Sequence, residues 1–287
     1  MEEDGKVKVC KTIKEVRKAV AGARAGGAKV GIVPTMGALH EGHMSLVRRS
    51  VADNGATIVS IFVNPTQFGP AEDLGKYPRP FEADCRACEA AGVTIVFAPE
   101  AAEMYGKDFS TYVEETKLSK GLCGASRPGH FRGVTTVVAK LFNIVGPDRA
   151  YFGQKDAQQA AVIKRMARDL DMGVEIVVMP IVREADGLAM SSRNAYLSAR
   201  EREEAILLSR GLAEAERLFE GGERRAAALV EAVRKTIAQA PDAKVDYIEA
   251  VDAETLERVE MIRGRTLLAV AVFVGKTRLI DNAVLEP

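Results

Sequence analysis

"GIVPTMGALHEGHMSLVRRS", residues 31–50, contains two of the three histidines of the chain, His40 and His43. The stretch continues an apolar, β-branched run, passes through a proline and a glycine, and then takes on helical spacing. We therefore predict a strand at 30–33, a turn at 34–38 and a helix directly after it. In that helix the two histidines lie three residues apart on one face of the first turn, so both imidazoles are expected to point toward the same place.

Apolar runs and stretches of helical spacing keep alternating after this opening. Further β-branched runs occur at 57–63, 93–97 and 174–179. Stretches with helical spacing lie between them, at 44–53, 80–91 and 158–170. This alternation predicts an α/β fold with a doubly wound parallel sheet, a Rossmann-like domain whose ligand site lies at the carboxyl ends of its strands.

The pattern changes from about residue 183. Charged helical stretches follow at 198–220 and 223–239, and strand-like pieces follow at 245–251, 266–274 and 277–281. Helices followed by strands are typical of an α+β domain. We therefore expect a Rossmann-like domain at 1–182 that binds the ligands, and a smaller α+β C-terminal domain at 183–287 that closes over a nucleotide.

The composition argues against several classes of function. The 287 residues include 40 basic and 40 acidic side chains, so no net charge attracts a nucleic acid. The longest uninterrupted apolar run, 267–274, is far shorter than the roughly 20 residues of a membrane-spanning helix. The acidic N-terminus does not resemble a secretory signal. We expect a cytoplasmic protein that binds neither nucleic acid nor membrane.

The four cysteines are Cys10, Cys85, Cys88 and Cys123, and only Cys85 and Cys88 are close in sequence. A structural zinc site needs four ligands, and neither a second pair of cysteines nor a nearby histidine completes one. Free thiols are therefore expected.

The two clustered histidines lie where phosphate chemistry is expected. A helix N-terminus offers unpaired backbone N–H groups and a partial positive charge, and imidazoles at that place can donate hydrogen bonds to phosphate oxygens. Two alternatives stay open. The histidines could be partly buried polar residues, or half of a metal site, although the remaining histidine, His130, is distant in sequence.

An HxGH motif at a strand-to-helix turn resembles the nucleotide-binding signature of class I aminoacyl-tRNA synthetases and their nucleotidyltransferase relatives, the HIGH superfamily. The fuller string PTMGALHEGHMSLV resembles the pantothenate synthetase family. Further segments resemble that family in the same order: VSIFVNPTQF (59–68), RPGHFRGVTTVV (127–138), YFGQKDAQQ (151–159) and READGLAMSSRN (183–194). The resemblance therefore extends from the N-terminal strand into the C-terminal domain.

This resemblance implies a carbon–nitrogen ligase of coenzyme A biosynthesis that condenses (R)-pantoate with β-alanine. ATP and Mg²⁺ are used, pantothenate, AMP and pyrophosphate are released, and a pantoyl-adenylate is the intermediate. A homodimer is implied as well. The sequence shows no cluster of metal ligands, so Mg²⁺ is expected to arrive with the triphosphate and to be held chiefly by its oxygens.

The resemblance also assigns roles to residues. His43 matches the position of the proton donor, His40 would share the stabilisation of phosphate charge, and Lys155 would place an ammonium on phosphate oxygens. Gln67 matches a position that contacts both pantoate and β-alanine, and Gln159 matches a pantoate-binding position. Without the resemblance, Gln67 is predicted to be an exposed turn residue and Lys155 a solvated helix start. The residues matched to ATP contacts are Met36, Gly37, Ala38, Leu39, His40, Glu41, Gly42, His43, Gly153, Gln154, Lys155, Asp156, Val182, Met190, Ser191, Ser192 and Arg193.

Two loops complete the expected site. MSSR at 190–193 takes the place of the KMSKS loop of the wider superfamily without its lysines, and its hydroxyls and guanidinium suit a triphosphate. Its position at the expected domain boundary suggests a hinge. RPGHFRGV at 127–134 is glycine-rich and basic, and we expect a mobile cover there, followed by a helix at 134–145. The resemblance assigns no role to its charged residues, which are Arg127, His130 and Arg132.

Two other functions remain open from the sequence. A nucleotidyltransferase that attaches AMP or CMP to a phosphate ester would release pyrophosphate but never AMP. An ATP-binding sensor on the same scaffold would bind nucleotide without pantoate-dependent turnover, and would not need Gln67 and Gln159 together. A tRNA synthetase is disfavoured, since the chain has no anticodon-binding extension and no basic excess.

Overall fold

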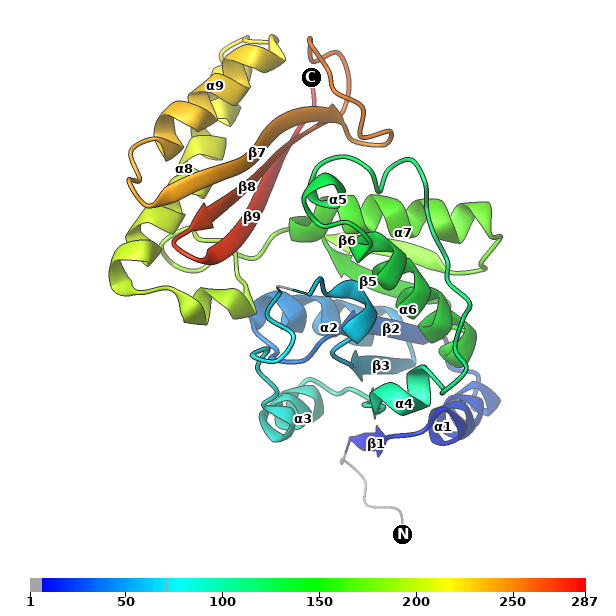
Figure 1. The fold of residues 1–287 in the computed structure, drawn as a ribbon. Helices are drawn as coiled ribbons and strands as arrows, with labels where there is room; N and C mark the ends of the chain where they lie inside the picture. The colour runs from blue at the N-terminus through cyan, green and yellow to red at the C-terminus, as the bar shows by residue number, and fades with distance from the viewer. Residues whose placement is uncertain (1–6, 71) are drawn as a thin grey trace. The chain divides into compact units, whose positions relative to one another are not determined.

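The computed structural model describes residues 7–70 and 72–287, which form two compact units that interleave along the chain (Figure 1). The first unit contains the described residues up to Thr116, together with Arg127–Gly153 and Val162–Met179; the second contains Lys117–Ser126, Gln154–Ala161 and Pro180–Pro287. The sequence predicts a single division after residue 182, whereas two short internal segments group with the C-terminal part. A C-terminal domain that closes over a nucleotide stays a prediction.

The first unit is built on a six-stranded parallel sheet with the strand order β1-β4-β3-β2-β5-β6. Its strands are β1 (Lys8–Cys10), β2 (Val30–Thr35), β3 (Ala56–Ile61), β4 (Ile95–Phe97), β5 (Arg149–Gly153) and β6 (Glu175–Met179). Each pair of neighbours is parallel. The predicted doubly wound parallel sheet is therefore confirmed, with an additional edge strand, β1, that was not predicted.

Helices connect these strands and cover the sheet. They are α1 (Ile13–Ala25), α2 (Glu41–Asp53), α3 (Phe81–Ala90), α4 (Ala101–Met104), α6 (His130–Val145) and α7 (Ala157–Asp169), and a short 3₁₀ helix, η1 (Pro65–Gln67), follows β3. Helix α7 begins in the second unit and ends in the first.

A row of valines shows how the sheet and its helices hold together. Val33, Val59 and Val96 are partners in register on three neighbouring strands, and all three are fully buried. They pack in one cluster with Leu46 and Val47 of α2. Burial of each such side chain contributes about 1.5–3 kcal/mol, so this row fixes α2 firmly on the sheet. The strand–turn–helix unit of residues 30–53 therefore has a rigid base.

The strand order reverses between β2 and β5. From β2 the chain builds outward through β3 and β4, and it later returns to the other side of β2 with β5 and β6. Ile32 and Ala150 are partners in register there. Doubly wound sheets bind their ligands beyond the carboxyl ends of the strands at such a reversal. The segments that follow Thr35 of β2 and end β5 at Gly153 lie at this place.

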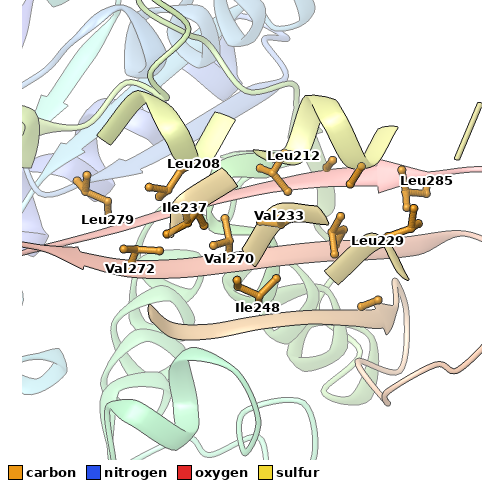
Figure 2. Packing of buried hydrophobic residues seen from close by; sticks show 14 of the residues in the cluster. Leu208, Leu212, Leu229, Val233, Ile237, Ile248, Val270, Val272, Leu279 and Leu285 are labelled. Carbon is orange, nitrogen blue, oxygen red and sulfur yellow. The ribbon is translucent and has the colours of Figure 1, made fainter. Parts of the chain in front are cut away.

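The second unit is an antiparallel sheet of three strands with two long helices on one face. The strands are β7 (Ala243–Asp252), β8 (Thr266–Val274) and β9 (Thr277–Leu285), the long helices are α8 (Ala199–Glu220) and α9 (Ala226–Ile237), and the short elements are α5 (Cys123–Ser126), η2 (Gln154–Asp156) and η3 (Ser192–Tyr196). Figure 2 shows Leu208 and Leu212 of α8 and Val233 of α9 in one cluster with Val270 and Val272 of β8. The predicted α+β fold of this part is confirmed.

Two elements have bounds that differ from the predicted ones, and strand pairing explains both differences. The helix predicted at 223–239 begins only at Ala226, because Arg225 forms a β-bridge with Met261. The strand predicted at 277–281 continues to Leu285, which pairs with Thr266. Its buried polar residue Asn282 interrupts the apolar pattern, although the backbone remains extended.

No helix in the part of the chain that the structure describes is long and apolar enough to cross a membrane. The acidic residues at 1–6, on which the prediction about a secretory signal depends, lie outside the described residues.

Candidate functional site

The two clustered histidines lie together at the start of α2. His40 is the N-cap residue, with an extended backbone, so it precedes the helix instead of lying in its first turn as predicted. The ring centroids of His40 and His43 are 4.1 Å apart. Nδ1 of His40 accepts a hydrogen bond from the Gly42 amide at 3.1 Å, and Nδ1 of His43 accepts one from the His40 amide at 3.3 Å. The pair therefore forms a capping box made of imidazoles.

These contacts set the tautomer of both rings. A backbone amide only donates, so neither Nδ1 carries a proton while it accepts one of these bonds. A neutral imidazole with an unprotonated Nδ1 carries its proton on Nε2. His40 and His43 are therefore both Nε2–H donors, which is the form that suits the oxygens of a phosphate.

Five backbone amides of this loop already have acceptors, so for these five the prediction of unpaired N–H groups is wrong. The amide of Gly37 donates to Oγ1 of Thr35 at 3.1 Å, and the amides of Ala38 and Leu39 donate to the carboxylate of Asp84 at 2.9 and 2.8 Å. Those of His40 and Gly42 donate to the two imidazoles. Local acceptors satisfy these amides, so they fix the shape of the loop.

Asp84 of α3 holds this loop in place, and no feature of the sequence predicted that contact. Its side chain is only 3% exposed, and its carboxylate lies under the loop. Burial raises the pKa of Asp84 above its ordinary value, and the hydrogen bonds from the Leu39 and Ala38 amides offset only part of that rise. The loop backbone bends sharply around the carboxylate, with φ of 82° at Gly37 and 52° at Ala38. An added Cβ at Gly37 would lie 3.0 Å from Oδ2 of Asp84, so glycine fits this turn.

Gln67 of η1 lies beside this loop. Its Nε2 donates to Sδ of Met36 at 3.3 Å, and its Oε1 accepts from Nδ2 of Asn64 at 3.0 Å. Asn64 is 1% exposed; its Nδ2 also donates to the Gly133 carbonyl at 3.1 Å, and its Oδ1 accepts from the Tyr105 hydroxyl at 2.7 Å. Because a carbonyl only accepts, these bonds fix the orientation of the Asn64 amide and hence of the Gln67 amide. Two expected site residues, Met36 and Gln67, are thus brought together.

Within the expected mobile cover at 127–134, residues 130–134 form the start of α6, so the helix predicted at 134–145 begins earlier; the mobility of this stretch stays a prediction. Nε and Nη2 of Arg127 donate to the carboxylate of Glu72 at 2.7 and 2.8 Å, and Nη1 donates to Nε2 of His130 at 2.9 Å. A guanidinium only donates, so Nε2 of His130 accepts and its Nδ1–H donates to the Gln67 carbonyl at 2.9 Å. Arg132 lies over the ring of Tyr112. Contacts between distant residues therefore hold this stretch.

Glu72, in the loop after η1, is the ion-pair partner of Arg127, which lies just before α6. Burial raises the pKa of Glu72, but the hydrogen bond and charge of Arg127 outweigh it and hold that pKa below its ordinary value. The ion pair is therefore formed at neutral pH, and it fixes the backbone that presents Gln67.

In the second unit, the segment with Lys155 is held by β9. Nδ2 of Asn282 donates to the carbonyl oxygens of Gln154 and Lys155 at 2.9 and 3.1 Å, and Nε2 of Gln154 donates back to Oδ1 of Asn282 at 3.3 Å. Gly153, the last residue of β5, belongs to the first unit. An added Cβ there would meet no atom within 4 Å, so the backbone at Gly153 is open to a ligand.

The helix that follows carries two adjacent glutamines with different surroundings. Gln158 is buried: its Nε2 donates to the carbonyls of Leu118 and Gly121, and its Oε1 accepts from the Cys123 amide. Gln158 thus holds the segment 117–126 in the second unit. The expected substrate residue Gln159 is half-buried beside it.

The loop before α8 is a small hairpin. The Met190 amide donates to the Val182 carbonyl at 3.0 Å, so these two expected nucleotide contacts are backbone partners. Ser191 caps η3 through a bond from the Arg193 amide at 3.3 Å. Ser192 and Arg193 lie within η3. The binding of a triphosphate by the Ser191 and Ser192 hydroxyls and the Arg193 guanidinium stays a prediction, as does the role of the loop as a hinge.

Within the described ranges, no group of three or more histidine, cysteine or acidic side chains is arranged to hold a metal. All four cysteines are free thiols. The close pair Cys85 and Cys88 lies on α3, and burial raises the pKa of Cys88 to about 12, so this thiol stays protonated.

Comparisons with known proteins find one matching family and several similar proteins. A family model described as pantoate-beta-alanine ligase matches residues 8–284. A curated relative, the pantothenate synthetase of Thermotoga neapolitana, is 58% identical over 279 residues, which are 97% of this chain and 100% of the relative. A crystal structure of pantothenate synthetase from Thermus thermophilus is 43% identical, with a TM-score of 0.93, and the match covers 98% of this chain and 100% of that one.

A second solved structure contains ligands. It is the pantoate-beta-alanine ligase from Francisella tularensis complexed with beta-gamma ATP and beta-alanine, 32% identical, with a TM-score of 0.79 and a match that covers 97% of each chain.

Proposed function

Since the chain belongs to the pantoate-β-alanine ligase family, we propose that it condenses (R)-pantoate with β-alanine through a pantoyl-adenylate and releases AMP and pyrophosphate. The observation that supports this most strongly is the pair of Nε2–H donors on His40 and His43. They lie at the start of α2, directly after the loop that follows β2 and next to the reversal of strand order where doubly wound sheets bind ligands.

The first step needs groups that stabilise a transferring phosphate. A pantoate carboxylate oxygen attacks the α-phosphorus of ATP, the bond from that phosphorus to the bridging oxygen breaks, and pyrophosphate leaves. No proton has to move in this step. His43 and His40 donate hydrogen bonds to the phosphate oxygens as charge builds on them, and Lys155 offsets the charge of the leaving pyrophosphate. Ser191, Ser192 and Arg193 bind the same triphosphate.

The second step makes the amide. The neutral amine of β-alanine attacks the acyl carbon of the adenylate, the bond from that carbon to the phosphate oxygen breaks, AMP leaves, and the amine proton passes to solvent. Gln67 is fixed with its Oε1 toward Asn64. It therefore meets a substrate as an Nε2–H donor, which suits a pantoate oxygen, and Gln159 is assigned to pantoate by the family resemblance.

The remaining assignments follow the family resemblance. The nucleotide contacts are proposed at the loop of residues 36–43, at Gly153–Asp156 through backbone and Lys155, and at Val182 and Met190. The described residues offer no metal-binding cluster, so ATP is proposed to enter as its magnesium complex, with Mg²⁺ as part of the substrate. We also propose a homodimer in the cytoplasm; the four free thiols fit a reducing compartment.

One assay separates this function from its rivals. Purified protein is incubated with ATP, Mg²⁺ and pantoate, pyrophosphate is measured, and AMP is measured after β-alanine is added. The proposal predicts pantoate-dependent pyrophosphate, followed by one AMP for each pantothenate. A simple nucleotidyltransferase would release pyrophosphate but never AMP, and a nucleotide sensor would release neither. Either result would overturn the proposal.

A further inference from the structure

We propose that Asp281 and Asn282, two adjacent residues in the middle of β9, are positioning residues that hold both ATP-binding segments of the second unit in place. This inference rests on the proposed function, which assigns the segment around Lys155 and the hairpin of residues 182–193 to ATP. Neither Asp281 nor Asn282 is expected to touch a substrate.

Asn282 holds the first of these segments by its backbone. It is 4% exposed, and its Nδ2 donates to two successive carbonyl oxygens, of Gln154 at 2.9 Å and of Lys155 at 3.1 Å. Both acceptors are carbonyls, so the orientation of the amide is fixed with its nitrogen toward η2. The side chain of Gln154 closes the contact by donating to Oδ1 of Asn282. The bond to the Lys155 carbonyl therefore fixes the backbone position from which the Lys155 side chain extends.

Asp281 holds the second segment through an arginine. It is 3% exposed, and its carboxylate accepts from Nη1 and Nη2 of Arg183 at 2.6 and 3.0 Å. Nη1 of Arg183 also donates to the Gly187 carbonyl at 3.1 Å, across the turn of the hairpin. The backbone of Arg183 forms a β-bridge with Ala189, next to the expected ATP contacts. One guanidinium thus joins β9 to the turn of the hairpin at Gly187.

Asp281 and Asn282 are adjacent on β9, so one strand holds both assigned segments. Successive side chains of a strand point to opposite faces, so neighbours can reach different segments from a single rigid backbone. That backbone is fixed by its pairing with β8, where Asp281 faces Val270 and Asn282 faces Ala269. Oδ1 of Asp281 also accepts the Asn282 amide at 2.8 Å.

The cost of burying these groups argues for a purpose beyond folding. Val270 and Ala269, their partners on β8, are apolar and buried, and a buried polar side chain stabilises a sheet less than an apolar one would. The Asp281 carboxylate accepts from Arg183 and from the Asn282 backbone amide. The Asn282 side-chain amide donates to the carbonyls of Gln154 and Lys155. An apolar pair would pack against the sheet, but it would leave Lys155 and the hairpin unanchored.

Asn282→Asp tests the first contact. The substituted side chain has nearly the same shape, but an oxygen replaces the nitrogen and faces two carbonyl oxygens, so the backbone of Lys155 must move. A displacement of about 1 Å costs up to roughly 100-fold in rate. We expect the KM for ATP to rise at least 10-fold, while the KM for β-alanine stays within 2-fold of the wild-type value. A lesion that only destabilises the fold would not separate the two substrates in this way.

Asp281→Asn is the second variant, and it has a matched control. It keeps the shape of the side chain but removes the charge that binds Arg183, so a rise of 3- to 10-fold in the KM for ATP is expected. Asp246 of β7 is paired with Arg278 at 2.7 Å in the same sheet, and its Oδ1 accepts from the Ser126 hydroxyl; neither partner belongs to the two assigned segments. Asp246→Asn removes an equivalent ion pair, and its KM for ATP is expected to match the wild type.

The outcomes are distinct. An ATP KM within 2-fold of the wild type in Asn282→Asp would overturn the inference, and so would equal rises for ATP and β-alanine. If the wild-type protein forms no pantothenate, the proposed function fails instead. Titration calorimetry with α,β-methylene ATP then still decides the inference, since Asn282→Asp is expected to weaken binding at least 10-fold and Asp246→Asn is not. Unchanged affinity in Asn282→Asp would refute it.

Discussion

The backbone amide of His40 donates to Nδ1 of His43 at 3.3 Å, so a ring that we assign to the phosphate also holds the first turn of α2. Nδ1 of His40 likewise accepts a hydrogen bond from the Gly42 amide. Each imidazole therefore uses one nitrogen to build the helix start and presents the other as a donor. The catalytic groups and the local fold depend on the same atoms.

Substitutions at His40 separate the capping role of its Nδ1 from the hydrogen-bond donor role of its Nε2. Asparagine is a good N-cap, so His40→Asn is expected to keep the bond from the Gly42 amide, whereas His40→Ala loses it and about 1 kcal/mol of stability. Both variants lose the Nε2–H donor, and pantoate-dependent pyrophosphate release is expected to fall by about 100-fold in both. Urea unfolding and the pyrophosphate assay measure the two effects. Near-normal activity of His40→Asn would remove the ring from the mechanism.

Gly133 allows α6 to approach Gln67, which we assign to pantoate. An added Cβ would lie 2.6 Å from both N and Cα of Gln67 and would clash with the Thr66 carbonyl. Gly133→Ala is therefore expected to displace η1, to raise the KM for pantoate at least 10-fold, and to lower the free energy of unfolding by about 1–3 kcal/mol.

A glycine in open space provides the control for that substitution. An added Cβ at Gly106, also in the first unit, would meet no atom within 4 Å. Gly106→Ala is expected to leave the KM for pantoate unchanged. If the two variants had the same KM for pantoate, η1 would not depend on the close approach of α6.

The buried Asp84 predicts a pH dependence of stability with a definite sign. Burial raises its pKa in the folded protein, so the folded state binds the proton more tightly than the unfolded chain does. The stability linked to this carboxyl is fully present below the unfolded pKa of about 3.9, and it is lost as the pH rises through the folded pKa.

Asp84→Asn removes this titration and serves as the reference. The free energy of unfolding of the wild type minus that of Asp84→Asn is expected to decrease between about pH 3.5 and pH 7. Any constant cost of the amide under the loop cancels in that comparison. Chemical denaturation at the two pH values provides the measurement, and a difference that grew with pH would show that the amides of Ala38 and Leu39 outweigh burial.

Local patterns made much of the fold predictable. The unit of β2 and α2 follows from an apolar run, a proline and helical spacing within residues 30–53, and contacts at that range need no knowledge of the rest of the chain. The predicted start of α2 is one residue too early, because histidine is an uncommon cap and its Nδ1 acceptor role depends on the final backbone geometry.

Contacts between distant residues could not be read from the sequence. Asp84 looks like an ordinary acidic residue of a helix, and only the folded chain brings it under Ala38 and Leu39. Asn282 looks like the end of a strand, yet it binds backbone more than a hundred residues away. The grouping of 117–126 with the C-terminal unit likewise depends on Gln158. The one feature of the sequence that could have indicated such a contact is the polar Asn282 beside the apolar residues of β9.

Isotope transfer tests the adenylate most directly. Pantoate labelled with ¹⁸O in both carboxylate oxygens is turned over with ATP and β-alanine in ordinary water, and the products are analysed by mass spectrometry. If the carboxylate attacks the α-phosphorus, one ¹⁸O appears in each AMP, the other remains in the amide carbonyl of pantothenate, and pyrophosphate carries none. Unlabelled AMP, or label in pyrophosphate or inorganic phosphate, would contradict the account.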